Sequence, residues 1–443
     1  MTCYEAHIVI LSDIPKDFGP DIEVIVGMPA KNPWSLPFGY KTLFMERLDQ
    51  YDLFIYSEDD TLITERNVDA FMEVTQVLPD NYIAGFIRYE VSESGRKYYS
   101  TIHSHYHWNP NSVMKIGNYI LAHYTNEHSA CFILTQNQLK KAIYSGGFLL
   151  PARAGRYGMP ETASTDPYTQ CGLKKMVCIS HLENFSLHHL PNAYLGKMGI
   201  SEAMLSSQIQ RMIEIEKGRH TRKQLLDAET KLIDATLHKK YYEKPHNEFL
   251  CFLPKDLKSV LSVGCGWGAN EEKLIKQGAN VTGIPLDSVI ASCAELRGIE
   301  TTSPNFCVAF KELKNRRFDC VLFINILEYI EEPERIFQQF SSLLNPSGIV
   351  GIAIHNFNHL SLLKKKISKK EIYKDITEIG NYDRTGLHRP TKRQIQKLFL
   401  NNGLKATFKM FAPNNRYRIF SKISFGRLNP WISFYLYAFG RLK

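Results

Sequence analysis

The chain has 443 residues, which is long enough for two or three domains. Hydrophobic residues make up 44% of it and charged residues 22%, which excludes a disordered or collagen-like chain. The net charge of +9 comes from the C-terminal end, because residues 384–443 contain 13 Lys and Arg residues and no Asp or Glu. No run of about 18 apolar residues occurs, so the sequence predicts no transmembrane helix.

The nine cysteines are scattered, and none of them forms a CxxC pair. A zinc knuckle or a thioredoxin-like redox motif is therefore not expected. Free thiols spread through a large chain are typical of a reducing compartment. No secretory leader is recognisable at the start of the sequence, so we expect a cytoplasmic protein. The expectation includes peripheral contact with the inner face of the membrane.

The first half of the sequence alternates between predicted strands and helices. β-branched and apolar runs bounded by turn residues predict strands at 7–12, 22–28, 51–56, 82–90, 102–108 and 130–135. The strand at 51–56 ends in the acidic cluster Glu58-Asp59-Asp60. Three adjacent acids repel one another unless a cation or a partner is present, and carboxylate oxygens suit Mg²⁺ or Mn²⁺. A solvated loop that caps the next helix is the other interpretation.

The run PWSLPFGYKTLFMERLDQYDLFIYSEDDTLIT resembles the nucleotide-sugar site of GT-A glycosyltransferases. The resemblance covers about residues 5–195. It implies a nucleotide-sugar donor and a Mn²⁺ or Mg²⁺ ion held by Glu58 and Asp60. It further implies a late metal-binding histidine, which is His188 or His189 in the segment SLHHLP.

An acceptor-side acid is also implied by this resemblance, and Asp166 or Glu161 in the segment ETASTDPYTQCG fits that role. Such a carboxylate would take the proton of the acceptor hydroxyl. One departure concerns length, because only about 57 residues precede the acidic cluster, which is short for this fold. Separately, His103, His105 and His107 share one face of the predicted strand at 102–108, where they either bind zinc, line an acceptor groove or are exposed.

Residues 201–244 are highly charged and nearly free of Gly and Pro, which predicts a helical connector. A second α/β pattern follows, with strands at 259–264, 280–284, 318–324 and 349–354 that alternate with helices. This alternation is typical of a mostly parallel sheet. The predicted fold class is therefore α/β with two α/β domains. The predicted segments are a first domain at 1–200, a connector at 201–240, a second domain at 241–412 and a basic aromatic tail at 413–443.

A glycine-rich turn, Val263-Gly264-Cys265-Gly266-Trp267-Gly268, closes the first strand of this second pattern and precedes a helix. Glycines allow a sharp turn and a close approach of the backbone to a ligand. Ligands of open α/β sheets bind at the carboxyl ends of the strands. The turn therefore predicts a binding site at this edge of the sheet.

Four ordered motifs over about residues 240–412 resemble a class I S-adenosylmethionine-dependent methyltransferase. They read VLSVGCGWG, VTGIPLD, FDCVLFINILEYIEEPERIF and LLNPSGIVGIAI. The resemblance implies a seven-stranded sheet and S-adenosylmethionine as cofactor. The residues implied to line the amino-acid moiety of that cofactor are Gly264, Cys265, Gly266 and Gly268. Those implied to lie near the adenine and the reaction centre are Asn325, Ile326 and Leu327.

One position departs from the methyltransferase pattern. An acidic residue usually ends the second strand and holds the ribose hydroxyls, but the residue after VTGI is Pro285. We expect Asp287, two residues further on, to take that role. For a hydroxyl acceptor a general base is needed, and His355 is the best-placed candidate, with His388 as another. Each histidine has the alternative of being an ordinary solvent-facing or satisfied side chain.

The tail mixes basic residues with eight aromatic residues, which predicts either an interfacial membrane anchor or a terminal helix packed on the second domain. No nucleic-acid-binding module is recognisable.

The two resemblances together lead us to expect a bifunctional enzyme that transfers a sugar and methylates a hydroxyl of a glycan or glycolipid acceptor. The alternative is a single-activity methyltransferase whose N-terminal domain only binds the acceptor. A methyltransferase acting on RNA through the basic tail is a third possibility.

Overall fold

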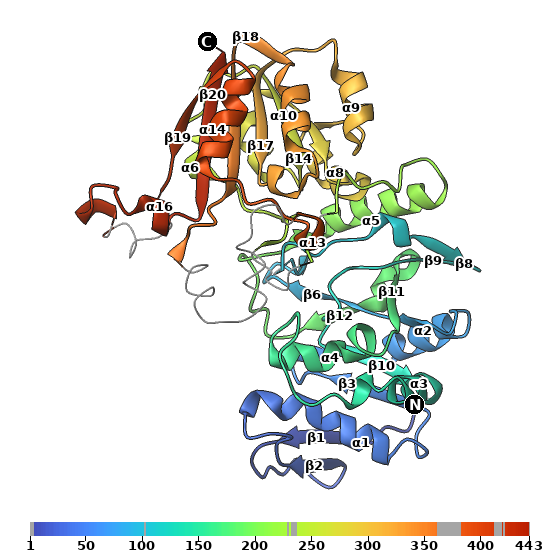
Figure 1. Cartoon of the computed structure of the whole chain (residues 1–443). Coiled ribbons are helices and arrows are strands. Elements are labelled where there is room, and N and C mark those ends of the chain that lie inside the picture. Colours follow the sequence, from blue (N-terminus) through green and yellow to red (C-terminus); the bar gives the residue numbers. More distant parts are fainter. Residues whose placement is uncertain are drawn as a thin grey trace. The chain divides into compact units, whose positions relative to one another are not determined.

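The computed structural model divides into two compact units, Met1–Arg219 and His220–Lys443 (Figure 1). It describes residues 4–101, 103–227, 230–231, 237–360, 382–411, 419 and 421–442. The division falls close to the end of the predicted connector's first helix, α5 (Glu202–Glu216). Gly218 follows that helix with φ +73°, a left-handed conformation that commonly ends helices. Residues 217–227 contain no helix, so the predicted helical connector is interrupted there.

The first unit is an α/β unit whose strands form several small sheets. Its strands are β1 (Ile8–Ser12), β2 (Ile22–Val26), β3 (Leu53–Ser57), β4 (Thr61–Leu62), β5 (Tyr82–Ala84), β6 (Ile87–Val91), β7 (Lys97–Tyr99), β8 (Met114–Ile116), β9 (Tyr119–Ala122), β10 (Cys131–Thr135), β11 (Lys174–Cys178), β12 (Ser186–His189) and β13 (Ile200–Ser201). Its other α-helices are α1 (Tyr40–Glu46), α2 (Glu65–Thr75), α3 (Gln136–Tyr144) and α4 (Met159–Thr169). Short 3₁₀ helices are η1 (Pro33–Gly39), η2 (Pro110–Ser112), η3 (Gly147–Leu149) and η4 (Ile179–Phe185).

The strands of this unit pair as β1-β2, β10-β3, β5-β11-β9-β8 and β13-β7-β6-β12-β4. The pairing of β12 with β4 matters most for the site, because it sets His189 opposite Thr61, next to the acidic cluster. The strand predicted at 102–108 is absent, since residues 103–107 form turn and coil and only Trp108 makes an isolated bridge.

The second unit is built on one seven-stranded sheet of order β16-β15-β14-β17-β18-β20-β19. Its strands are β14 (Ser259–Cys265), β15 (Asn280–Pro285), β16 (Glu300–Thr301), β17 (Phe318–Ile324), β18 (Leu344–His355), β19 (Leu404–Lys409) and β20 (Tyr435–Leu442). Its helices are α6 (Asn247–Leu250), α7 (Ala269–Ile275), α8 (Ser288–Glu295), α9 (Phe306–Leu313), η6 (Leu327–Tyr329), α10 (Pro333–Ser341), α13 (Tyr382–Thr385), α14 (Lys392–Asn401) and α16 (Asn429–Ile432).

The first five strands of the sheet order pair in parallel, whereas β20 runs antiparallel to both β18 and β19. The central strands β14 and β17 are almost entirely buried, as expected of parallel strands covered on both faces. The predicted βαβ alternation and the seven-stranded sheet are therefore confirmed.

The structure of the basic C-terminal segment differs from the predicted terminal helix. Residues 435–442 form β20, inside the sheet, rather than a terminal helix packed on the domain. Alternating buried and polar positions would have indicated a strand, but the aromatic run is buried on both faces and gave no period of two. Among the described residues, no helix is long and apolar enough to cross a bilayer.

Candidate active site

The glycine-rich turn after β14 is shaped by close contacts with the protein's own chain. Gly264 and Gly268 have φ values of +77° and +85°, which favour glycine. A Cβ atom on Gly266 would lie 2.3 Å from the carbonyl oxygen of Tyr241, and one on Gly264 would lie 2.5 Å from the side chain of Ile326. The glycines are therefore needed so that residues 240–241 and 326 can pack around the turn. This need is separate from any close approach of a ligand.

Residues 237–246 lie across this turn and bring a buried polar network with them. The Trp267 backbone N–H donates to the Tyr241 carbonyl at 2.9 Å, and its indole N–H donates to the Glu243 carbonyl at 2.7 Å. The Glu243 carboxylate accepts from Asn270 at 3.1 Å and from Asn325 at 3.3 Å. Glu243 is not among the residues predicted from the sequence, although the dense charged and aromatic run at 239–246 is a signal that could have located it.

Lys239 and His246 complete this network. The ammonium group of Lys239 is fully buried, donates to the Ile324 carbonyl at 2.9 Å and lies 3.7 Å from Glu243. His246 lies 3.8 Å from the same carboxylate. Burial opposes the charged form of Glu243, but Lys239, His246 and Asn325 outweigh it and hold the pKa of Glu243 below its ordinary value. The Asn325 amide N–H therefore donates to a charged carboxylate, that of Glu243.

Asn325 has the geometry of a ligand-binding residue. It follows β17 with φ +47°, a left-handed conformation that is uncommon outside glycine. Its side chain is buried, and its Oδ1 atom has no hydrogen-bond partner among the described residues. A buried amide oxygen without a partner costs about 1–3 kcal/mol unless a donor binds there. This oxygen fits the ammonium group of an amino acid moiety such as that of S-adenosylmethionine.

The other two residues predicted after β17 are apolar and buried. Ile326 packs against Gly264, and Leu327 begins η6. Cys265 is buried at the end of β14. These three residues form the apolar surroundings of the turn. Of the residues predicted after β17, Asn325 is the one that offers a polar side-chain atom.

Asp287 lies where α8 begins, and its Oδ1 atom accepts from the backbone N–H groups of Val289 and Ile290, each at 2.8 Å. This is an N-cap, which satisfies donors at the start of the helix. Segment 221–225 covers the residue, with the Leu225 N–H donating to the Leu286 carbonyl at 2.7 Å. The described contacts give Asp287 a capping role, and its contact with ribose stays a prediction.

His355 ends β18 and is held by a buried carboxylate. Glu328, in η6, is fully buried, and its Oε1 atom lies 3.1 Å from His355 Nδ1 and accepts the His355 backbone N–H at 2.7 Å. A carboxylate facing Nδ1 keeps the proton on that nitrogen, so Nε2 can accept a proton from another group. Sequence analysis missed Glu328, which the motif NILEYIEEP gave no reason to separate from its acidic neighbours.

His388, the other candidate base, is placed differently. Its ring stacks on Tyr382 with centroids 4.4 Å apart, and its Nε2 atom lies 3.2 Å from the Glu331 carbonyl oxygen. A carbonyl acceptor at that distance indicates that Nε2 carries the proton. The geometry therefore favours His355 over His388 as a proton acceptor.

In the first unit, the acidic cluster and one late histidine are brought together. His189 Nε2 lies 3.2 Å from Asp60 Oδ2, and His189 Nδ1 lies 2.7 Å from Glu90 Oε1. His188 points elsewhere, since its ring stacks on Tyr89 at 5.2 Å. The alternation of side chains along β12 explains why only one of the two histidines meets the cluster.

Glu58 and Glu161 lie near one another in the same unit. Burial raises the pKa of Glu58 to about 7, and the charges of Asp60 and Glu161 act in the same direction, while Arg88 opposes them. Glu58 also lies 3.8 Å from His128 Nε2. Even so, within the described ranges no three His, Cys, Asp or Glu side chains are arranged to hold one metal ion. The predicted Mn²⁺ or Mg²⁺ site therefore has no support from this geometry.

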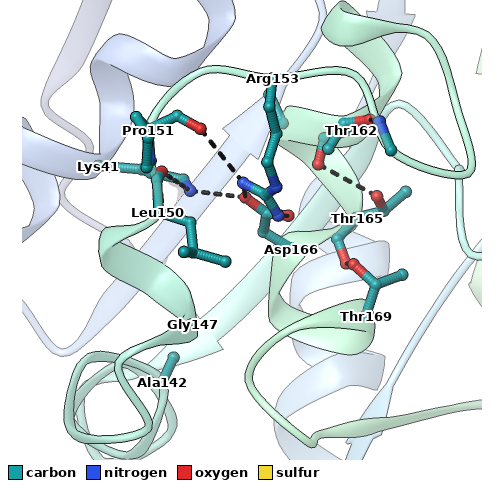
Figure 2. A network of polar contacts seen from close by, with 12 residues as sticks. Lys41, Ala142, Gly147, Leu150, Pro151, Arg153, Thr162, Thr165, Asp166 and Thr169 are labelled. Atoms are coloured by element: carbon teal, nitrogen blue, oxygen red, sulfur yellow. Dashed lines mark hydrogen bonds and ion pairs between the residues drawn. The ribbon is translucent and has the colours of Figure 1, made fainter. Parts of the chain in front are cut away.

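Asp166 is fully buried and paired with two cations (Figure 2). Its carboxylate lies 2.6 Å from the ammonium group of Lys41 and 2.7 Å from the guanidinium of Arg153. The same cations donate to the carbonyl oxygens of Leu150 and Pro151, at 3.0 and 3.3 Å. Asp166 thus ties the loop after η3 to α4, an arrangement that favours a structural role over proton transfer.

The three predicted His residues at 103–107 do not form an exposed strand face. His105 and His107 are buried, and burial lowers the pKa of His107 to about 3, so that it is neutral. The expectation of a shared strand face was wrong because the segment turns at 103–105. No zinc site forms there among the described side chains.

A family model described as a methyltransferase domain matches residues 236–407. The ubiquinone biosynthesis O-methyltransferase of Colwellia psychrerythraea is 31% identical over 138 residues, which are 30% of this chain and 56% of that protein. That of Chromobacterium violaceum is 36% identical over 106 residues, 23% of this chain and 46% of that protein. The chain thus spans about half the length of these curated relatives.

An S-adenosylmethionine-dependent methyltransferase structure from Mesorhizobium loti is 17% identical, with a TM-score of 0.31, and the match covers 44% of this chain and 95% of that one. None of these matches identifies the fold of the first unit. The four ordered motifs, the glycine turn and the family match agree for the second unit. Residues 236–407 form a class I S-adenosylmethionine-dependent methyltransferase domain.

Proposed function

We propose that the chain transfers a methyl group from S-adenosylmethionine to a hydroxyl oxygen, and that His355 is the general base. The observation that carries the proposal is the contact between His355 and the buried Glu328 at the carboxyl end of β18. That end lies at the same edge of the sheet as Asn325 and the glycine turn, because β14, β17 and β18 are parallel neighbours. The curated relatives named as O-methyltransferases support oxygen as the acceptor atom.

Each residue has a distinct role in this proposal. S-adenosylmethionine supplies an activated methyl group, which is transferred as the bond to its sulfur breaks. Asn325 Oδ1 would accept a hydrogen bond from the ammonium group of the bound cofactor. His355 Nε2 would take the proton of the acceptor hydroxyl, and Glu328 would stabilise the positive charge on the imidazole.

The first unit would then bind the acceptor, which we propose to be a glycan or glycolipid. The test is incubation of the full chain with methyl-labelled cofactor and a panel of glycan, glycolipid and phenolic acceptors. Label in a glycan product, lost in His355→Ala, is the expected result. Label only in phenolic products would contradict the glycan acceptor while leaving methyl transfer intact.

A second candidate function, sugar transfer by the first unit, is favoured by one contact, the 3.2 Å approach of His189 to Asp60. A late histidine beside the acidic cluster is what the GT-A resemblance implies. Hydrolysis of UDP- or GDP-sugars that requires Mn²⁺ and is lost in Asp60→Asn would support this function. Equal hydrolysis with and without Mn²⁺, or in the variant, would reject it and leave acceptor binding as the role of this unit.

A further inference from the structure

The connection between β19 and β20 exposes an unusual number of apolar side chains. They belong to Ile419, Ile423, Phe425, Leu428, Trp431 and Phe434. Phe425 is 94% exposed and Ile423 is 71% exposed. Large apolar side chains exposed together in one short segment indicate interaction with a protein or a membrane. We call residues 421–434 of this connection the apolar lobe.

The apolar lobe is held in shape by its own hydrogen bonds. Asn429 accepts from the Ser421 hydroxyl at 2.6 Å and donates to the Met410 carbonyl at 3.1 Å. Phe425 and Gly426 adopt positive φ values of +48° and +77°, which form the turn that carries Phe425 outward. The buried residues Ile432 and Ser433 anchor the end of the lobe. The exposure of its apolar side chains is therefore a built feature of the fold.

The charge around these side chains indicates which partner they fit. Lys422 and Arg427 lie within the lobe, and residues 384–443 contain no acidic residue. An apolar surface interleaved with aromatic and basic side chains is complementary to the interface of an anionic bilayer. A protein partner of ordinary composition would not require such a one-sided charge.

The lobe also lies next to the edge of the sheet where His355 is found. The Asn356 side-chain amide donates to the carbonyl oxygens of Pro430 and Ser433, at 2.9 and 2.7 Å, and its backbone N–H donates to that of Phe434 at 2.8 Å. His359 stacks on Phe434 with ring centroids 4.3 Å apart. Figure 1 shows α16 near the end of β18 and the start of β20, at this edge of the second unit.

We propose that the apolar lobe docks the second unit on the surface of an anionic lipid bilayer. Phe425, Ile423 and Trp431 enter the headgroup region, and Lys422 and Arg427 contact lipid phosphates. Docking brings the carboxyl edge of the sheet next to the membrane surface. The docking does not depend on the proposed methyl transfer, so it is tested by binding alone.

The test is co-sedimentation of the full chain with vesicles of equimolar phosphatidylcholine and phosphatidylglycerol, compared with pure phosphatidylcholine. We expect much tighter binding to the anionic vesicles. Lys422→Gln/Arg427→Gln should weaken it roughly 25-fold at low salt, since each basic residue near the surface contributes about fivefold. Ile423→Ser/Phe425→Ser should weaken it about tenfold or more, because apolar area no longer enters the interface.

Matched controls carry the same changes on another exposed face of the second unit. They are Leu296→Ser/Val308→Ser for the apolar pair and Lys311→Gln/Lys314→Gln for the basic pair, and both should bind as the unmodified chain does. Equal loss in the controls and in the lobe variants would overturn the proposal. So would binding of single-stranded RNA that the lobe variants abolish, with no binding of either vesicle.

Discussion

Both units hold a histidine at the end of a strand against a buried carboxylate, yet the two arrangements differ in what surrounds them. In the second unit, Glu328 holds His355, and Asn325 Oδ1 has no partner among the described residues. In the first unit, His189 lies between Glu90 and Asp60, and both of its ring nitrogens are engaged. A histidine with only one ring nitrogen engaged among the described residues, at the same edge of the sheet as an unsatisfied acceptor, indicates a reaction site more strongly than a histidine between two carboxylates.

The comparison is sharpened most by replacing His355. His355→Ala should lower kcat by about 10²–10⁴-fold, because general-base catalysis contributes that much, while binding of S-adenosylhomocysteine is unchanged. The measurement is transfer of labelled methyl groups to whichever acceptor the unmodified chain uses. His388→Ala is the matched control and should keep nearly full activity. A similar loss in both variants would show that neither histidine is specifically the base.

Breaking the buried ion pairs tests the structural role assigned to Asp166. Asp166→Ala leaves Lys41 and Arg153 without their partner, and unpaired buried charges cost about 3–5 kcal/mol. The first unit should therefore unfold at a much lower urea concentration. The measurement is urea unfolding of the full chain, monitored by its intrinsic fluorescence. Unchanged stability together with a loss of sugar transfer would instead assign the carboxylate to catalysis.

Gly266→Ala tests the packing of residues 240–241 on the glycine turn. The added Cβ atom meets the Tyr241 carbonyl at 2.3 Å, and such overpacking costs about 1–3 kcal/mol. Weaker binding of S-adenosylhomocysteine and a lower melting temperature of the second unit are expected. Gly155→Ala in the first unit is the control, because its Cβ would meet nothing closer than 3.6 Å. Equal effects of the two changes would refute the steric account.

The raised pKa of Glu58 predicts how the first unit responds to pH. The folded state holds the Glu58 proton more tightly than the unfolded chain does, so stability falls as pH rises from the ordinary pKa of 4.5 to about 7. The loss should be on the order of 2 kcal/mol. Urea unfolding of the full chain at both ends of this window measures it. Glu58→Gln should flatten the dependence of the unfolding free energy on pH. An unchanged pH dependence in that variant would assign the effect to other groups.

The sequence was informative where several motifs had to occur in order. The strands that end in the glycine turn and in Asn325 could be predicted because apolar runs, glycines and helices repeat at the spacing of a parallel sheet. The acidic cluster and His189 were also located, but a short motif could not identify the fold around them. Glu328 could not be found and Glu243 was not singled out, since the importance of both comes from burial and from contacts between distant segments.

Other differences between the sequence and the structure have local physical causes. Asp287 was expected at the ribose, which stays a prediction, and the structure adds a role as helix cap, because an aspartate directly before a helix satisfies that helix's backbone N–H groups. Asp166 was expected to act as a base, and nothing in the sequence indicated that Lys41, 125 residues away, would pair with it. The residues of β20 were assigned to a tail because a strand buried on both faces has no alternating pattern.

Titration calorimetry of S-adenosylhomocysteine into the full chain tests the central claim most directly. The account predicts binding, weakened about tenfold or more in Asn325→Gly, because a charge-assisted hydrogen bond contributes about 1.5–3 kcal/mol. That substitution tolerates the left-handed backbone and removes only the side-chain amide. No binding by the unmodified chain, in material whose second unit is shown to be folded, would contradict the account.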